Sequence, residues 1–231
     1  MLGILILAVL CVYIAYASHE FRRAYATYTT LVQANVDAAY VPGAENNPLR
    51  QHLNTVLSQV LARPMSAKER MDFAEEGLKV LKAAEQQIDV IGDTGDKVQL
   101  SITYMQEKAR APGAFLLRGY VTRILSLATE EHNITADIRG LSYRANFHTA
   151  EIFNRIVLDK GELTPAYLQE LNRQVPAVEE QFNKRTGLYA QLKDVSARMQ
   201  AESMDLAHVW WLFGGGEGDI HSAPSNVQKA V

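Results

Sequence analysis

Apolar residues recur at alternating spacings of three and four along most of this chain of 231 residues. The longest series spans residues 168–213, a second spans residues 117–152, and a third spans residues 71–88, with a few polar residues at the repeating positions. An average spacing of 3.5 is typical of long helices that pack at shallow angles, as in coiled coils and helical bundles. A weak strand-like alternation at residues 98–102 also fits a helix. The sequence therefore predicts an all-α fold, an elongated bundle of long antiparallel helices.

Glycine, proline and capping residues divide the body into helices. The boundaries lie at Pro42-Gly43, Asn47-Pro48, Arg63-Pro64, a capping box from Ser66 to Glu69, Ala111-Pro112-Gly113, Lys160-Gly161, Thr164-Pro165 and Gly214-Gly215-Gly216. They predict helices near residues 48–62, 66–110, 114–160 and 165–213, and thus a bundle over residues 20–213.

Further breaks are predicted inside two of these helices. The glycines of residues 92–95 indicate a break in one, and Pro176 should kink or interrupt the last helix near Gln174. The small, polar residues 214–231 are expected to form a disordered tail.

The last two predicted helices should pair as an antiparallel hairpin around residue 162. In that register the numbers of facing residues sum to about 324, which aligns Leu141 with Phe182. The same register brings Glu131, at a position of the repeat, near Lys193. Polar groups at such positions weaken a coiled coil but fix its register.

Residues 1–17 carry no charged side chain. Seventeen helical residues span roughly 26 Å, close to the ~30 Å hydrocarbon core of a bilayer. We therefore expect residues 1–19 to form a single transmembrane anchor. The alternative is a cleaved signal peptide, because Ala15-Tyr16-Ala17 has the A-x-A form. The lack of a Lys or Arg before the run, and of a helix breaker after it, favours the anchor.

Charge and composition bear on location and partners. Arg22 and Arg23 directly follow the apolar run, so the positive-inside rule favours a cytoplasmic body. The net charge is −3 and the basic residues are scattered, which argues against nucleic-acid binding. The bilayer and other proteins, including further copies of this chain, are the expected partners.

The sequence contains no recognisable catalytic or metal-binding motif. The single cysteine, Cys11, lies in the apolar run, so the body has neither a thiolate nucleophile nor a cysteine-based zinc site. No Glu-x-x-His pair, P-loop or G-x-S-x-G motif occurs. We therefore expect no catalytic residue, no metal and no cofactor, and a protein that is not an enzyme.

The most distinctive local feature is an aromatic cluster near the end of the last predicted helix, formed by Trp210, Trp211 and Phe213. One interpretation is that Trp210 and Phe213 complete the buried face of that helix. The other is that adjacent aromatic residues contact lipid headgroups or a partner protein. The cluster is thus the candidate membrane or partner contact.

A short apolar segment that continues into long antiparallel helices is similar in outline to the LemA family. Tyr28-Thr29-Thr30-Leu31-Val32 occupies the place of that family's Tyr-Asn-x-Leu-Val sequence, with threonine instead of asparagine. The Arg-rich and Pro-containing signature that follows in the family is absent here. The sequence therefore identifies no family.

Three functional hypotheses follow. The leading one is a membrane-anchored scaffold or adaptor subunit that presents a coiled-coil-like surface to protein partners. The second is a ligand-sensing helical bundle of a membrane receptor system, whose output would have to come from another chain. The third and least favoured is a helical-bundle enzyme.

Overall fold

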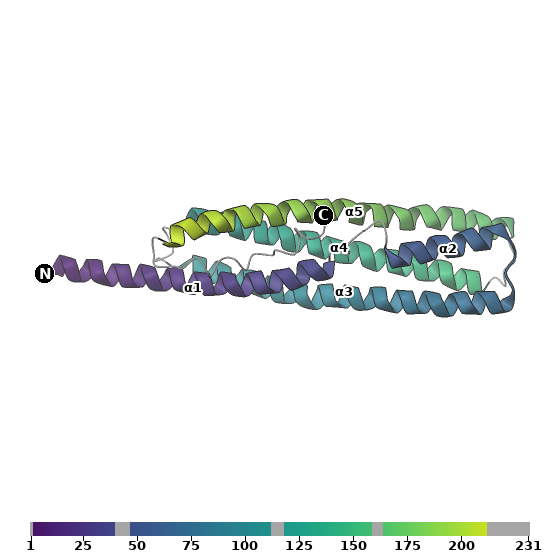
Figure 1. Ribbon diagram of the computed structural model, residues 1–231, viewed down its shortest axis with the longest axis horizontal. Helices are drawn as coiled ribbons and strands as arrows, with labels where there is room; N and C mark the ends of the chain where they lie inside the picture. The colour runs from purple at the N-terminus through teal and green to yellow at the C-terminus, as the bar shows by residue number, and fades with distance from the viewer. Residues whose placement is uncertain (1, 40–46, 112–117, 159–163, 212–231) are drawn as a thin grey trace. The chain divides into compact units, whose positions relative to one another are not determined.

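The computed structural model describes residues 2–39, 47–111, 118–158 and 164–211 (Figure 1). In these ranges every regular element is a helix, which confirms the all-α prediction. The helices are α1 (Leu2–Ala39), α2 (Pro48–Ala62), α3 (Ala67–Ala109), α4 (Arg118–Leu158) and α5 (Pro165–Trp211). The predicted tail, residues 214–231, lies outside the described residues.

Two helix starts form as the sequence predicted. The side chain of Asn47 accepts hydrogen bonds from the backbone N–H groups of Leu49 and Arg50, so it caps α2. The capping box before α3 is also present. The Ser66 N–H donates to the Glu69 carboxylate at 2.8 Å, and the Glu69 N–H donates to the Ser66 hydroxyl at 3.3 Å.

The predicted break at residues 92–95 is wrong, because α3 continues through them. α5 also continues through Pro176, so no interruption occurs there, and the alternative of a kink stays a prediction. Gly92 permits a close approach: a Cβ atom there would lie 2.6 Å from Cζ of Arg139 on α4. Leu171 and Val178 are buried on either side of Pro176. Tertiary packing therefore outweighs the local cost of these residues in a helix.

The chain divides into two compact units. Unit 1 comprises Met1–Asp37, Asp93–Thr135 and Gln191–Val231, and unit 2 comprises Ala38–Gly92 and Ala136–Ala190. Unit 1 thus contains parts of α1, α3, α4 and α5. Unit 2 contains α2 together with the remaining parts of α3, α4 and α5.

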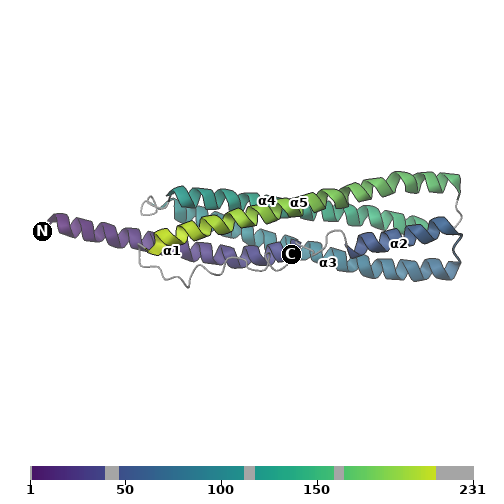
Figure 2. The same ribbon diagram turned by 45° about the horizontal axis from the view of Figure 1, so that its top comes forward.

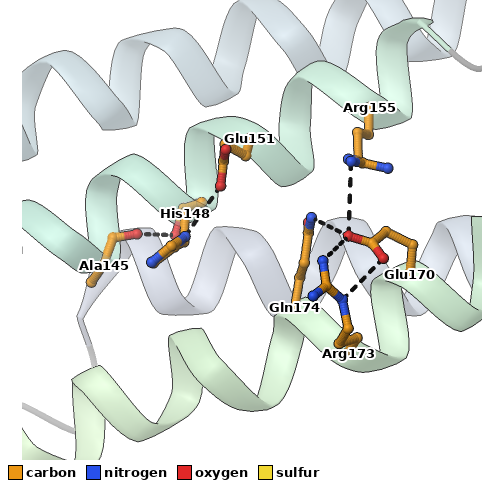
Figure 3. A network of polar contacts seen from close by, with 8 residues as sticks. Ala145, His148, Glu151, Arg155, Glu170, Arg173 and Gln174 are labelled. Carbon is orange, nitrogen blue, oxygen red and sulfur yellow. Dashed lines mark hydrogen bonds and ion pairs between the residues drawn. The ribbon is translucent and has the colours of Figure 1, made fainter.

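Unit 2 has an apolar core. Polar contacts between α4 and α5 confirm that these helices pair in the predicted antiparallel arrangement. Arg144 donates to Gln181 at 3.2 Å, and Arg155 lies 3.8 Å from Glu170, so both pairs have numbers that sum to 325. Figure 3 shows that the Glu170 carboxylate forms an ion pair with Arg155 of α4 and accepts hydrogen bonds from Arg173 and Gln174 of its own helix. The core includes Leu49, Leu53, Val56, Leu57, Val60, Met65, Leu81, Ala145, Ile152, Phe153, Ile156, Leu171, Val178 and Phe182.

We predict that Phe182→Ala destabilises unit 2 by roughly 3–5 kcal/mol, because the side chain is 3% exposed and its loss leaves a cavity. Phe147→Ala on α4 is the matched control, since that ring is 54% exposed and its removal should cost less than about 0.5 kcal/mol. Urea unfolding of the full chain in neutral detergent, followed by far-UV circular dichroism, measures both. Equal losses for the two variants would contradict this packing.

Candidate functional site

The N-terminal part of α1 is an apolar helix that no other described part of the chain covers. In both views it extends past the ends of the other helices of unit 1 (Figures 1 and 2). Leu2 is 75% exposed, Ile4 74% and Val12 70%. Among the described residues, α1 is the one helix long and apolar enough to cross a membrane, because an 18-residue window within it has a mean hydropathy of 2.1.

The environment of α1 changes at Ala17, which is the first buried residue of the helix. From there the buried residues recur at helical spacing and pack into unit 1. They are Ala17, Ser18, Phe21, Ala24, Tyr25, Tyr28, Thr29, Val32, Asn35 and Val36. One uninterrupted helix therefore has an uncovered apolar half and a packed half, and packing begins two residues before the predicted end of the anchor at residue 19.

A buried polar cluster joins three helices in unit 1. The hydroxyl of Tyr28 on α1 donates to Oε2 of Glu131 on α4 at 2.8 Å. The hydroxyl of Ser196 on α5 donates to Oε1 of the same carboxylate at 2.7 Å. Glu131 is 2% exposed. The residue of α5 that donates a hydrogen bond to Glu131 is therefore Ser196, one turn beyond Lys193, and the predicted proximity of Glu131 to Lys193 stays a prediction.

Burial controls the protonation of this cluster. Removal from water raises the pKa of Glu131, and the two donated hydrogen bonds offset only part of that effect. Burial and the neighbouring carboxylate raise the pKa of Tyr28 well above its usual value. The cluster thus joins α1 to α4 and α5 through two hydroxyl groups that donate to one buried carboxyl group, whose pKa burial raises.

Two further polar contacts hold α1 against α3. Asn35 donates to the hydroxyl of Thr94 at 2.8 Å, and Lys108 lies 3.2 Å from Glu20. The first contact lies near the end of α1 and the second lies just beyond Ala17. The packed half of α1 is therefore fixed in position along its length.

The cluster is built for attachment rather than for chemistry. Tyr28, Glu131 and Ser196 are all buried, so a substrate could reach the carboxylate only if the helices separated. Among the described residues, no three His, Cys, Asp or Glu side chains are grouped to hold a metal ion. In unit 2, a cavity lined partly by Phe73 and Phe153 measures about 10 Å³ and has room for one water molecule.

The predicted aromatic cluster falls at the limit of the described chain. Trp210 and Trp211 are the last residues of α5, their side chains lie outside the description, and so does Phe213. In unit 1, α5 runs antiparallel to α4, because Arg123 pairs with Glu202 at 2.8 Å and Glu130 pairs with Arg198 at 2.7 Å. The end of α5 therefore points toward the start of α4. The contact that this cluster makes stays a prediction.

Unit 2 has an exposed apolar face that we did not predict from the sequence. The face lies on α4 and is here called the outer stripe. It consists of Ala136, Gly140, Tyr143, Phe147 and Ala150. Tyr143 is 64% exposed and Phe147 is 54% exposed, and the spacings along the stripe are 4, 3, 4 and 3. The sequence signal that could have revealed this face is a second heptad series that runs beside the buried one on α4. Heptad spacing of exposed apolar residues is the pattern along which a second helix packs.

Comparison with known proteins places the chain in no group. No protein-family model, no curated protein and no solved structure matches it. The functional argument therefore depends on the uncovered half of α1, the buried cluster and the outer stripe.

We predict that Glu131→Gln alters the pH dependence of stability. The folded-state pKa of Glu131 lies above the ordinary value of 4.5, so its contribution is fully present below about pH 4.5 and is lost as the pH rises through the folded-state pKa. The uncharged glutamine does not titrate. The stability of Glu131→Gln relative to the wild type should therefore increase as the pH rises.

Urea unfolding of the full chain in neutral detergent at a series of pH values tests this. Glu107→Gln, which removes an exposed carboxylate, should show no such trend. A constant difference between Glu131→Gln and the wild type at all pH values would show that the buried carboxylate does not titrate as argued.

Proposed function

We propose that this chain is a single-pass membrane-anchored helical scaffold or adaptor subunit, which presents a helical surface to protein partners at the bilayer. The observation that carries the proposal is the division of α1 into an uncovered apolar half and a packed half. Eight large aliphatic side chains between residues 2 and 12 are 48–75% exposed. At roughly 1.5–3 kcal/mol each, their exposure to water would cost more than 10 kcal/mol, which is comparable to the stability of a domain.

The continuity of α1 supports a retained anchor over a cleaved signal peptide. Cleavage after Ala17 would cut the helix directly before Ser18 and Phe21, which are both buried in unit 1. The contact between Lys108 and Glu20 would then depend on a frayed helix end. Removing the apolar segment would therefore weaken the unit that it precedes.

The orientation is proposed from the charges next to the span. Arg22 and Arg23 follow the apolar half of α1, and no basic residue lies within it. By the positive-inside rule this favours a cytoplasmic location for the body.

The outer stripe supports the adaptor part of the proposal. Its two exposed aromatic rings lie one turn apart and are flanked by small residues at heptad spacing, which fits the side chains of a helix laid along α4. Arg144 and Glu151 flank the stripe on its exposed side and offer charges of both signs to a partner. A helix of another membrane-associated protein is the occupant we propose. A catalytic role is not part of the proposal.

Site-specific photocrosslinking in intact cells tests this role. We predict that a photoreactive phenylalanine at Tyr143 or Phe147 forms a discrete adduct with a second protein. The same group at Leu100, a 72%-exposed apolar residue of unit 1, is the matched control and should not form that adduct. An adduct with another copy of this chain would make the stripe a self-association surface instead. No adduct from either stripe position would contradict the adaptor proposal.

A further inference from the structure

The end of unit 1 from which the apolar half of α1 emerges gathers the ends of the other helices. Lys108, near the end of α3, pairs with Glu20 of α1 at 3.2 Å. α4 begins at Arg118, and Glu202 of α5 pairs with Arg123 in the second turn of α4. The chain therefore brings together four segments that are far apart in the sequence, beside the point where α1 changes from packed to uncovered.

These segments carry an excess of positive charge. The basic residues are Arg22, Arg23, Lys108, Arg110, Arg118 and Arg123, here called the basic collar, and the acidic residues in the same segments are Glu20, Glu107, Glu202 and Asp205. Six positive and four negative charges give +2, whereas the net charge of the whole chain is −3, which leaves −5 for the remainder. The collar is thus a local reversal of the charge of the protein.

Among the described residues, part of this positive charge has no carboxylate partner. Lys108 and Arg123 are paired with carboxylates. Within the described ranges, no carboxylate lies within 4.0 Å of Arg23, Arg110 or Arg118, and all three side chains are exposed. These three exposed arginines are the collar residues without a carboxylate partner among the described residues, so we assign them to an anion from outside the chain.

Tyrosine rings accompany the basic groups. The ammonium of Lys108 lies 5.0 Å from the ring centre of Tyr104, and the guanidinium of Arg123 lies 4.8 Å from that of Tyr120. Tyrosine is enriched where a membrane meets water, because its ring is apolar and its hydroxyl is polar. Basic and aromatic side chains together are the composition that the headgroup region favours.

We propose that the basic collar binds the phosphate groups of anionic lipids in the leaflet next to unit 1. The proposal rests on the membrane anchoring proposed above, which fixes the collar at headgroup depth. Arginine binds phosphate through two parallel N–H donors, so it suits this ligand better than the ammonium group of a lysine would. Each basic group near an anionic surface strengthens attachment roughly fivefold, so three give a preference on the order of 100-fold.

Native mass spectrometry of the full chain, released from micelles doped with equal amounts of phosphatidylglycerol and phosphatidylcholine, tests the proposal. The wild type should retain the anionic lipid selectively. The triple variant Arg23→Gln/Arg110→Gln/Arg118→Gln should lose most of that preference. The triple variant Lys68→Gln/Lys82→Gln/Lys97→Gln removes the same charge from exposed lysines outside the collar and should retain it.

Two further experiments distinguish a failure of the lipid-binding proposal from a failure of the membrane-anchor proposal. Glycerophosphate, which carries the headgroup chemistry without acyl chains, should not displace the retained lipid, and displacement at equal concentration would overturn the assignment to a lipid surface. Alkaline extraction of membranes should leave the collar variant embedded, because α1 is unchanged. An embedded wild type with no anionic preference would refute the collar alone, whereas release of the wild type itself would refute the anchor.

Discussion

The structure depends on the attachment of the packed half of α1 to unit 1. That attachment combines apolar burial with the buried carboxylate of Glu131, which accepts hydroxyl hydrogen bonds from Tyr28 and Ser196. Apolar contacts alone would tolerate sliding of one helix along another, whereas a buried polar cluster is satisfied in one register only. The position at which the apolar half leaves the unit is therefore fixed by the fold.

This constraint links the separate functional features. Because α1 is continuous, the register set at Tyr28 also sets the depth of Ala17, where packing begins. The ends of α3 and α4 then place Lys108 and Arg118 beside that point. A protein built in this way can hold a helical body at a defined height above a bilayer, which is a property that a membrane scaffold requires.

Much of the fold could be predicted from the sequence because its signals are local or periodic. Heptad spacing gave the helices and placed Phe182 in the core, and the capping residues Ser66 and Glu69 marked the start of α3. The features that could not be predicted from the sequence depend on tertiary contacts. Gly92 is typical of a helix break, and only the fold shows that Arg139 of α4 lies next to it. The predicted register of α4 and α5 agrees with the observed pairs, but the register alone did not identify Ser196 as the residue that donates a hydrogen bond to Glu131. The outer stripe was hidden because its series runs beside the stronger, buried one.

The most direct test uses the lone cysteine, Cys11, which lies in the middle of the apolar half of α1 and is exposed in the folded chain. The full chain is placed in vesicles opened by freeze–thaw and treated with a membrane-impermeant maleimide. Cys11 should remain unlabelled until a denaturing detergent is added, because hydrocarbon excludes the reagent. A variant with Cys11→Ser and Ala26→Cys, which places the thiol at an exposed position of the packed half, should react at once. Equal labelling of both thiols in intact bilayers would show that α1 does not enter the membrane.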